Sequence, residues 1–220
     1  MNLLAIDCST ERATVALTIN GVGTRLEQPA QRQHAQLLLP MVEQLLADAG
    51  LLLNQLDGIV FGRGPGSFTG LRIACSMAKG LGYAHDLPLY PVSTLTAIAY
   101  AAQQDEASYP ILAMIDARMN QLYWACFDHQ LYSEQELVSN ADAISVPGEG
   151  PIIVAGVNYN LYRESFTADL LGRMIIEKTI YPDAADMLQL VSGGKIQPVS
   201  AGDALPVYIR NQITQGEARG

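Results

Sequence analysis

Basic residues are scarce in this chain. Its 220 residues include 13 lysines and arginines against 22 aspartates and glutamates, which gives a net charge of −9. The 13 cations are also scattered along the sequence. A protein that binds nucleic acid by itself needs clustered lysine and arginine for the phosphates. We therefore expect any role with nucleic acid to depend on a partner.

Cysteines and long apolar runs are also few. Cys8, Cys75 and Cys126 lie far apart and form no Cys-x-x-Cys pair, which favours reduced, mostly buried thiols and a cytoplasmic location. No apolar run approaches the roughly 18–20 residues of a membrane span. The first residues lack the basic segment of a secretory signal and soon reach Asp7. We expect no membrane association.

Glycine, in contrast, is concentrated in residues 62–72, Gly-Arg-Gly-Pro-Gly-Ser-Phe-Thr-Gly-Leu-Arg. This stretch follows an apolar run and precedes a helical pattern, and two interpretations are open. The free N–H groups and the positive dipole end of a helix that begins here can hold an anion such as phosphate. Alternatively, the glycines serve a tight strand-to-helix turn that needs positive φ and close packing. The spacing matches neither the Walker loop nor the dinucleotide-binding fingerprint.

The first half of the chain predicts the order strand, strand, strand, helix, strand, helix, strand, helix. The pattern predicts strands at residues 3–6, 13–19, 24–28, 58–61 and 87–92, and helices at 33–49, 69–84 and 93–103. Asn20-Gly21 is a strong hairpin signal. Pro40 lies inside the first predicted helix, which we expect to be kinked there.

The polar residues before Pro110 predict a linker between two subdomains, residues 1–107 and 108–220. Beyond it the pattern predicts strands at residues 111–115, 121–127, 152–155 and 174–180, and helices at 160–171 and 183–191. Residues 133–150 are uneven, and we expect a loop with short elements.

This order, with Asp7 closing the first strand, is the layout of the actin, hexokinase and Hsp70 ATPase superfamily. We therefore expect an α/β protein with that ribonuclease H-like (ASKHA) fold, although order alone says little about activity. Four motifs go further: residues 4–10 (LAIDCST), 64–73 (GPGSFTGLRI), 115–118 (IDAR) with 123–125 (YWA), and 206–211 (PVYIRN). Together they resemble the TsaB (YeaZ) family of tRNA threonylcarbamoyladenosine biosynthesis proteins over nearly the full length.

The resemblance implies an accessory, non-catalytic role. Proteins of this family pair with a larger paralogue, TsaD, which carries the catalytic site, and the complex also uses the ATPase TsaE. It transfers a threonylcarbamoyl group from an adenylate, made by a separate enzyme, to the adenosine beside the anticodon in tRNAs that read codons beginning with A. We expect a subunit that meets tRNA only through this complex. Two alternatives stay open: an actin-like nucleotide hydrolase or kinase, and a glycoprotease-like peptidase.

The metal site of the TsaD-like relatives is expected to be absent. Those relatives have two histidines four residues apart on the helix after the fifth strand, a spacing that lets both bind one metal. The matching positions here are Thr94 and Ile98, and neither replaces an imidazole. The three histidines, His34, His85 and His129, are far apart, and we expect surface or capping roles for them.

Candidate nucleotide or phosphate contacts gather near the first strand and the glycine stretch. They are Asp7, Ser9, Thr10, Gly64 and Gly66. Asp7 either approaches a phosphate or Mg²⁺, or hydrogen-bonds the turn that follows it. In the next turn Glu11 would repel phosphate. No cofactor is firmly implied; we expect ATP or ADP with Mg²⁺ to act in the complex, mainly through the partner. No nucleophile triad stands out in the sequence, and Asp116 and Arg118 are expected to form a salt bridge across a turn.

Two predicted helices carry more apolar positions than one sheet face requires. The expected partner-interface residues are Leu37, Leu38, Met41, Val42, Leu45, Ile73, Met77 and Leu81. Two helices from each partner would pack side by side there and bury a standard interface of roughly 1,600 Å². Without the TsaD-like partner, we expect the same patch to form a symmetric homodimer.

Overall fold

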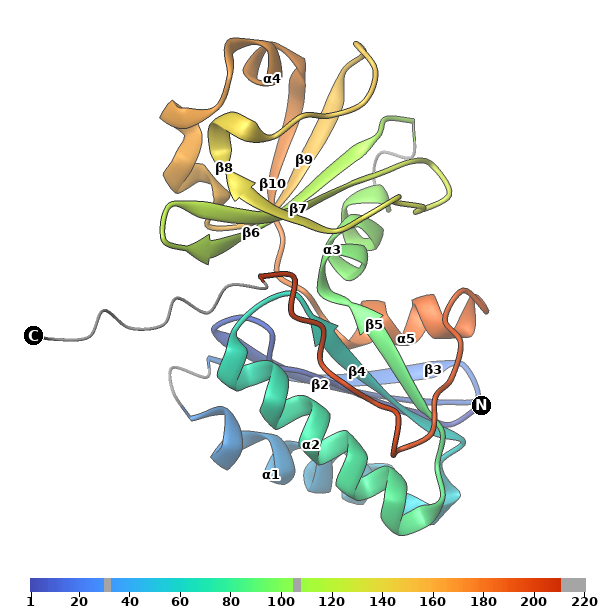
Figure 1. The fold of residues 1–220 in the computed structure, drawn as a ribbon. Helices are drawn as coiled ribbons and strands as arrows, with labels where there is room; N and C mark the ends of the chain where they lie inside the picture. The colour runs from blue at the N-terminus through green and yellow to red at the C-terminus, as the bar shows by residue number, and fades with distance from the viewer. Residues whose placement is uncertain (30–32, 105–107, 211–220) are drawn as a thin grey trace, which may run out of the picture.

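A computed structural model describes residues 1–29, 33–104 and 108–210. It has two subdomains, each built on a five-stranded sheet (Figure 1). The first sheet has the order β3-β2-β1-β4-β5 and the second the order β10-β9-β6-β7-β8. The predicted order of elements in the first half is confirmed, and the fold is of the expected actin-like α/β type.

The first sheet combines an antiparallel meander with two parallel strands. Its strands are β1 (Leu3–Asp7), β2 (Arg12–Ile19), β3 (Val22–Pro29), β4 (Gly58–Gly64) and β5 (Leu89–Ser93). β1 pairs antiparallel with β2 and parallel with β4. Asn20 and Gly21 join β2 to β3 with φ of 49° and 86°, which confirms the predicted hairpin, since both central residues of such a turn need positive φ.

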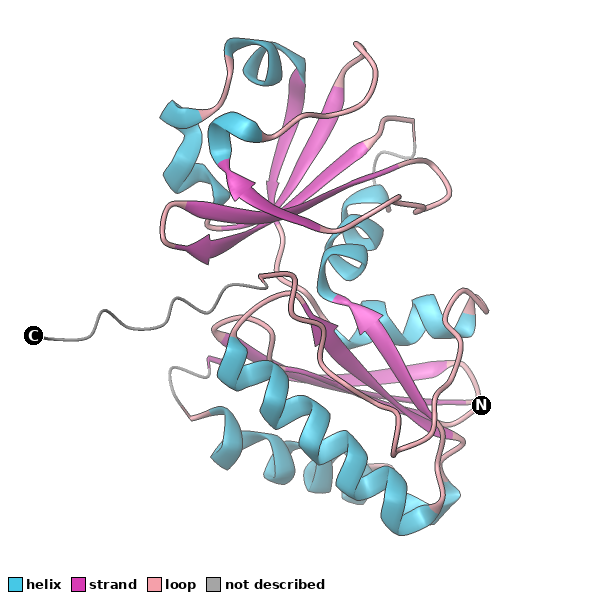
Figure 2. Cartoon of the chain, viewed as in Figure 1, coloured by secondary structure: helices cyan, strands magenta, loops and turns pink. Residues whose placement is uncertain are grey.

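Helices cover both faces of this sheet (Figure 2). Helices α1 (His34–Asp48) and α2 (Phe68–His85) lie on one face, and α5 (Ala184–Ser192) lies on the other. The alternation of β1 explains both layers: Leu4 and Ile6 pack under α1 and α2, whereas Leu3 and Ala5 pack under α5. Helix α1 continues through Pro40.

The second sheet is packed between α3 and three short helical segments. Its strands are β6 (Ile111–Arg118), β7 (Gln121–Phe127), β8 (Leu137–Asn140), β9 (Ile152–Val157) and β10 (Met174–Thr179). Helix α3 (Thr94–Gln103) packs on one face. The other face is covered by the 3-10 segments η2 (Ala141–Ala143) and η3 (Tyr159–Ser165) and by α4 (Ala168–Arg173). A further 3-10 turn, η1 (Leu53–Gln55), precedes β4.

The single helix predicted at residues 160–171 is wrong. The chain forms η3, becomes extended at Phe166, and then begins α4. Phe166 is buried in the core of the second subdomain, and the Thr167 hydroxyl accepts a hydrogen bond from Leu170 N at 3.2 Å. Burial of one aromatic side chain and a strong helix cap therefore break the helix where the apolar pattern alone continues it.

The predicted second subdomain, residues 108–220, is too long. After β10 the chain returns to the first subdomain, where Thr14 Oγ1 accepts a hydrogen bond from Ala184 N at 3.0 Å. Met187 of α5 packs in the same cluster as Leu3 and Val60. The chain then crosses the edge of the first sheet, where Val199 pairs with Leu89 through hydrogen bonds of 2.8 and 2.9 Å.

Across the three described ranges, no helix combines the length and apolarity that a membrane span requires. All three cysteines are free; Cys8 and Cys75 are buried and Cys126 is half-buried. The predicted burial of the thiols is confirmed for Cys8 and Cys75.

Candidate functional site

The glycine stretch packs tightly against the turn between β1 and β2. A Cβ atom at Gly66 would stand 2.3 Å from the Ser9 carbonyl oxygen, and one at Gly70 would stand 1.9 Å from that of Cys8. Ser67 N donates a hydrogen bond to Ser9 O at 2.7 Å, and the Ser67 hydroxyl caps α2 by accepting from Gly70 N at 3.3 Å. These contacts support the close-packing interpretation of the glycines.

A cleft of about 1090 Å³ separates the two subdomains beside this turn. The first subdomain lines it with the β1–β2 turn and the starts of α1 and α2. The second lines it with the end of β6, with Tyr123 of β7, and with the last residue of β9 and Asn158 that follows it. Of the predicted nucleotide contacts, Ser9, Thr10 and Gly66 line this cleft together.

Charges of both signs face the cleft. Glu11, Asp116, Arg118 and Arg210 all line it. Asp116 is held firmly: Oδ1 accepts from Arg118 N at 2.8 Å and from Tyr162 OH at 2.7 Å, and Oδ2 lies 3.1 Å from Arg118 Nη1. The predicted salt bridge across the turn is therefore confirmed. Partial burial of the Tyr162 ring and the hydrogen bond from its hydroxyl to Asp116 raise the pKa of Tyr162.

Asp7 lies below the cleft and does not line it. Its Oδ2 accepts hydrogen bonds from Ser9 N at 3.1 Å and Ser9 Oγ at 2.8 Å, as the turn interpretation predicted. Its Oδ1 is buried without a hydrogen-bond partner among the described residues, and a Cβ at Gly62 would stand 1.9 Å from it. Burial, reinforced by the nearby carboxylate of Asp183, raises the pKa of Asp7 to about 7.

Two of the five candidate nucleotide or phosphate contacts, Asp7 and Gly64, do not line the cleft. Gly64, like Asp7, faces away from the cleft, because its Cβ position is filled by Leu71 and by the carbonyl of Val207. The acid expected to orient Mg²⁺ is therefore absent from the cleft. No group of three or more histidine, cysteine, aspartate or glutamate residues able to hold a metal ion occurs within the described ranges.

The positions that correspond to the paralogue's metal pair belong to the core. Thr94 and Ile98 are both fully buried at the start of α3, which begins after Ser93 accepts from Thr96 N at 3.3 Å. His34 is the one histidine buried in the described chain, where its Nε2 lies 2.9 Å from the carbonyl oxygen of Thr10. It fixes the start of α1 to the β1–β2 turn, a tertiary role that sequence spacing did not indicate.

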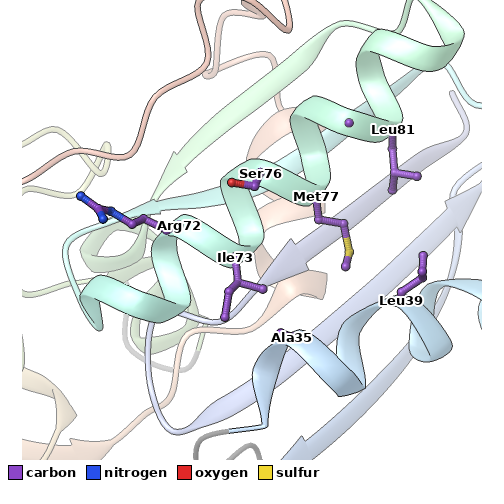
Figure 3. Close-up of a pocket in the computed structure, with 8 residues that line it drawn as sticks. Ala35, Leu39, Arg72, Ile73, Ser76, Met77 and Leu81 are labelled. Carbon is purple, nitrogen blue, oxygen red and sulfur yellow. The ribbon is translucent and has the colours of Figure 1, made fainter.

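A shallow apolar groove of about 530 Å³ lies between α1 and α2 (Figure 3). It is lined by Ala35, Leu39, Arg72, Ile73, Ser76, Met77, Gly80 and Leu81. Of the predicted interface residues, Ile73, Met77 and Leu81 line it, and Leu39 and Gly80 were missed. The missed signal was the four-residue spacing of Ala35 and Leu39, which places both on one face of α1.

Four predicted interface residues are wrong, because they lie in the core. Leu38, Met41, Val42 and Leu45 are between 0 and 4% exposed, packed between α1 and the first sheet. Leu37 is half-buried at the edge of the same core.

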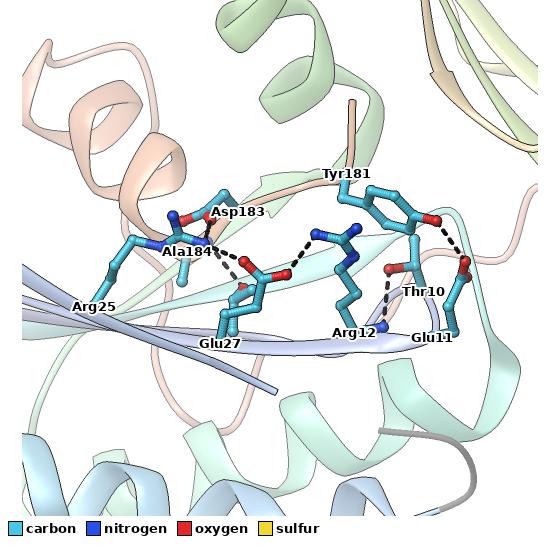
Figure 4. A network of polar contacts seen from close by, with 9 residues as sticks. Thr10, Glu11, Arg12, Arg25, Glu27, Tyr181, Asp183 and Ala184 are labelled. Atoms are coloured by element: carbon cyan, nitrogen blue, oxygen red, sulfur yellow. Dashed lines mark hydrogen bonds and ion pairs between the residues drawn. The ribbon is translucent and has the colours of Figure 1, made fainter. Parts of the chain in front are cut away.

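A polar network fastens the crossing from β10 to α5 (Figure 4). Arg25 forms an ion pair of 2.8 Å with Asp183 and a second one with Glu27, whose carboxylate also binds Arg12. The guanidinium of Arg12 stacks 3.6 Å from the ring centroid of Tyr181. Close by, burial and the neighbouring Asp183 raise the pKa of Asp186 to about 6.

The fold and a match to a known family together place this chain among the TsaD-like proteins with an actin-like fold. Residues 25–161 match the family model described as TsaD: tRNA N6-adenosine threonylcarbamoyltransferase, and the chain has the actin-like α/β fold. Two relatives that match nearly the full length of the chain identify the family within this class. The tRNA threonylcarbamoyladenosine biosynthesis protein TsaB of Haemophilus influenzae is 36% identical, over 97% of this chain and 95% of that protein. The protein of the same name from Escherichia coli is 34% identical, over 97% and 96%.

A solved structure of the same family also matches this chain. YeaZ from Pseudomonas aeruginosa superposes with a TM-score of 0.86 at 36% identity, and the match covers 94% of this chain and 99% of that one. The chain belongs to the TsaB (YeaZ) family.

Proposed function

We propose that this chain serves tRNA threonylcarbamoyladenosine biosynthesis as a non-catalytic subunit that binds a TsaD-like catalytic protein. The role in that pathway is supported by the two relatives named TsaB, which match nearly all of the chain. The observation that carries the docking role is the α1–α2 groove, where Leu39 is 44% exposed and apolar side chains from both helices face outward. A TsaE-like ATPase and tRNA join through the same complex, which works in the cytoplasm.

The non-catalytic assignment is supported by the buried Thr94 and Ile98, which occupy the positions of the paralogue's metal ligands. It is supported further by Asp7, which lies outside the cleft. Any ATP, ADP or Mg²⁺ that the complex uses therefore depends mainly on the partner.

The groove also suits a second copy of this chain. Ile73, Met77 and Leu81 follow one another at a four-residue spacing, so a two-fold axis beside α2 would bring identical ridges together. We propose that the free chain forms a homodimer through this groove, and that the TsaD-like subunit replaces the second copy.

A drop-out reconstitution tests the subunit role. It contains the cognate TsaD-like and TsaE-like proteins, the adenylate-forming enzyme, threonine, bicarbonate, ATP and unmodified tRNA, with or without this chain. Modified adenosine is expected only when the chain is present. Equal modification without it would contradict the proposal.

The groove is tested in the same assay by Gly80→Gln. Gly80 lines the groove, and no atom lies within 4 Å of its Cβ position, so the added side chain starts in open space at the groove. The matched control is Gly172→Gln in α4, where the Cβ position is equally open. We expect Gly80→Gln to weaken binding to the TsaD-like subunit at least tenfold and Gly172→Gln to leave it unchanged.

The alternative of a nucleotide-binding enzyme draws on one observation: Ser9, Thr10 and the start of α2 share the cleft with Arg118 and Arg210. Calorimetry of the purified chain with Mg-ATP tests it. Saturable binding that is lost in Arg118→Ala would favour this alternative, and no heat of binding would remove it.

A further inference from the structure

The C-terminal segment, residues 195–210, runs along one side of the first subdomain to its junction with the second (Figure 1). In Figure 1 it leaves α5, passes the edge of β5, turns near the far end of α2 and runs back to the junction of the subdomains. Val199 pairs with Leu89 of β5, and Lys79 Nζ of α2 donates to the carbonyls of Gly202 and Ala204 at 3.2 and 3.0 Å. We call residues 195–210 the strap.

The end of the strap contacts both subdomains. Val207 N donates to Arg63 O, at the end of β4, at 2.7 Å. Three residues later, Arg210 Nη2 donates to Gln121 Oε1 at 2.6 Å and to the Arg118 carbonyl at 3.4 Å. Gln121 begins β7 and Arg118 ends β6, so Arg210 fastens the strap to the β6–β7 turn, whose first residue, Arg118, lies in the wall of the cleft.

The strap is also fastened to a residue of the groove. Arg72 lines the groove between α1 and α2, and its Nε donates to the Tyr208 hydroxyl at 3.0 Å. The Arg72 guanidinium stacks on the ring of Phe68 at 3.8 Å from the centroid, and the rings of Phe68 and Tyr208 lie 5.3 Å apart.

The turn that Arg210 reaches is an unusual piece of backbone. Arg118, Met119 and Asn120 have φ of 63°, 54° and 60°, three successive residues in a region that costs side chains with a Cβ about 1 kcal/mol or more each. Such a turn persists only where its surroundings hold it, and Arg210 supplies contacts at both of its ends.

We propose that the strap is a latch that couples the α1–α2 groove to the cleft wall. The path runs from Arg72 to Tyr208, along the strap to Arg210, and into the turn at residues 118–121. A partner that moves Arg72 thereby changes how tightly this wall is held. The inference rests on the proposed function only in treating the groove as a docking surface, because the path itself lies within one chain.

Hydrogen exchange on the free chain tests the latch. In Arg210→Ala the amides of residues 118–121 are expected to exchange about tenfold faster, because a hydrogen bond from a charged donor is lost. The matched control is Leu205→Ala, on the same strap, since Leu205 is 65% exposed. Protected amides of β1 and β4 report whether each variant is folded. Unchanged exchange at residues 118–121 in folded Arg210→Ala would overturn the latch.

The coupling is tested from the groove end with Arg72→Ala and Tyr208→Phe. The second change removes only the hydroxyl that Arg72 binds and keeps the ring. Both are expected to speed exchange at residues 118–121, although neither side chain bonds to that turn. Adding Arg72→Ala to Arg210→Ala should give no further increase, because both act on one path. Acceleration confined to α2, or full additivity, would overturn the coupling. Failure of the TsaD-like protein to bind would contradict the proposed function and leave these exchange results valid.

Discussion

Replacing Asp7 by asparagine should stabilise the protein at neutral and alkaline pH. Burial raises the pKa of Asp7 from 3.8 to about 7, so between these pH values the folded chain holds a proton that the unfolded chain has released. The stability of the folded state therefore falls as pH rises through this window. Each pH unit corresponds to about 1.4 kcal/mol, so the ionised carboxylate costs about 4 kcal/mol at pH 8.

Asparagine keeps the carbonyl oxygen that Ser9 needs and carries no charge. Its amide group occupies the place of Oδ1, which has no partner in the described structure, so part of the gain is lost. We expect Asp7→Asn to raise the free energy of unfolding by about 2–4 kcal/mol at pH 8 and by about zero at pH 4. Urea denaturation at the two pH values measures this difference.

Asp48→Asn at the exposed end of α1 is the matched control, and it should change stability little at either pH. Asp186 also has a raised pKa, about 6, and contributes to the pH dependence of the parent and the variants alike. Comparison at each pH therefore isolates Asp7. A variant that is less stable at pH 8, or equally stabilised at pH 4 and pH 8, would refute the reasoning.

Two further predictions concern packing and capping. Gly70→Ala should lower stability by about 2 kcal/mol or more, because its Cβ would meet the Cys8 carbonyl; Gly80→Ala in the same helix has open space and should add up to about 1 kcal/mol. Urea denaturation compares them, and equal effects would contradict the role of Gly70. Thr14→Val removes the acceptor of Ala184 N and should cost about 1–2 kcal/mol, with faster exchange in the first turn of α5. Unchanged exchange there would contradict this role.

Local signals predicted the local structure well. Asn20-Gly21 predicted the hairpin, and the helices predicted at residues 93–103 and 183–191 begin where α3 and α5 begin. Ser93 and Asp183 cap these helices through atoms only two or three residues away. The apolar stripe of α1 correctly predicted a helix, but it did not separate the residues that face the core from those that face the groove. Neighbouring positions on a helix differ by about 100°, so Leu38 enters the core while Leu39 faces the groove.

Long-range packing explains what the sequence did not predict. Asp7 was a good candidate for a phosphate site, yet α5 arrives from the far end of the chain and brings Met187 to Gly62, beside the Asp7 carboxylate. No local pattern near Asp7 or in the strap indicates that approach. The cleft residues Ser9, Thr10 and Gly66 were predicted because they belong to the two motifs that meet there.

The covering of β1 by α5 also orders events during synthesis. The Thr14–Ala184 hydrogen bond joins residues 170 positions apart, and Leu3 and Ala5 pack against a helix that leaves the ribosome long after them. One face of the first sheet therefore stays uncovered while the second subdomain is translated, because α5 is made only afterwards. The second subdomain, made from one continuous stretch of chain, is free to fold before the first is complete. A delay of this kind leaves the apolar strands of the first sheet exposed to aggregation until α5 has been made.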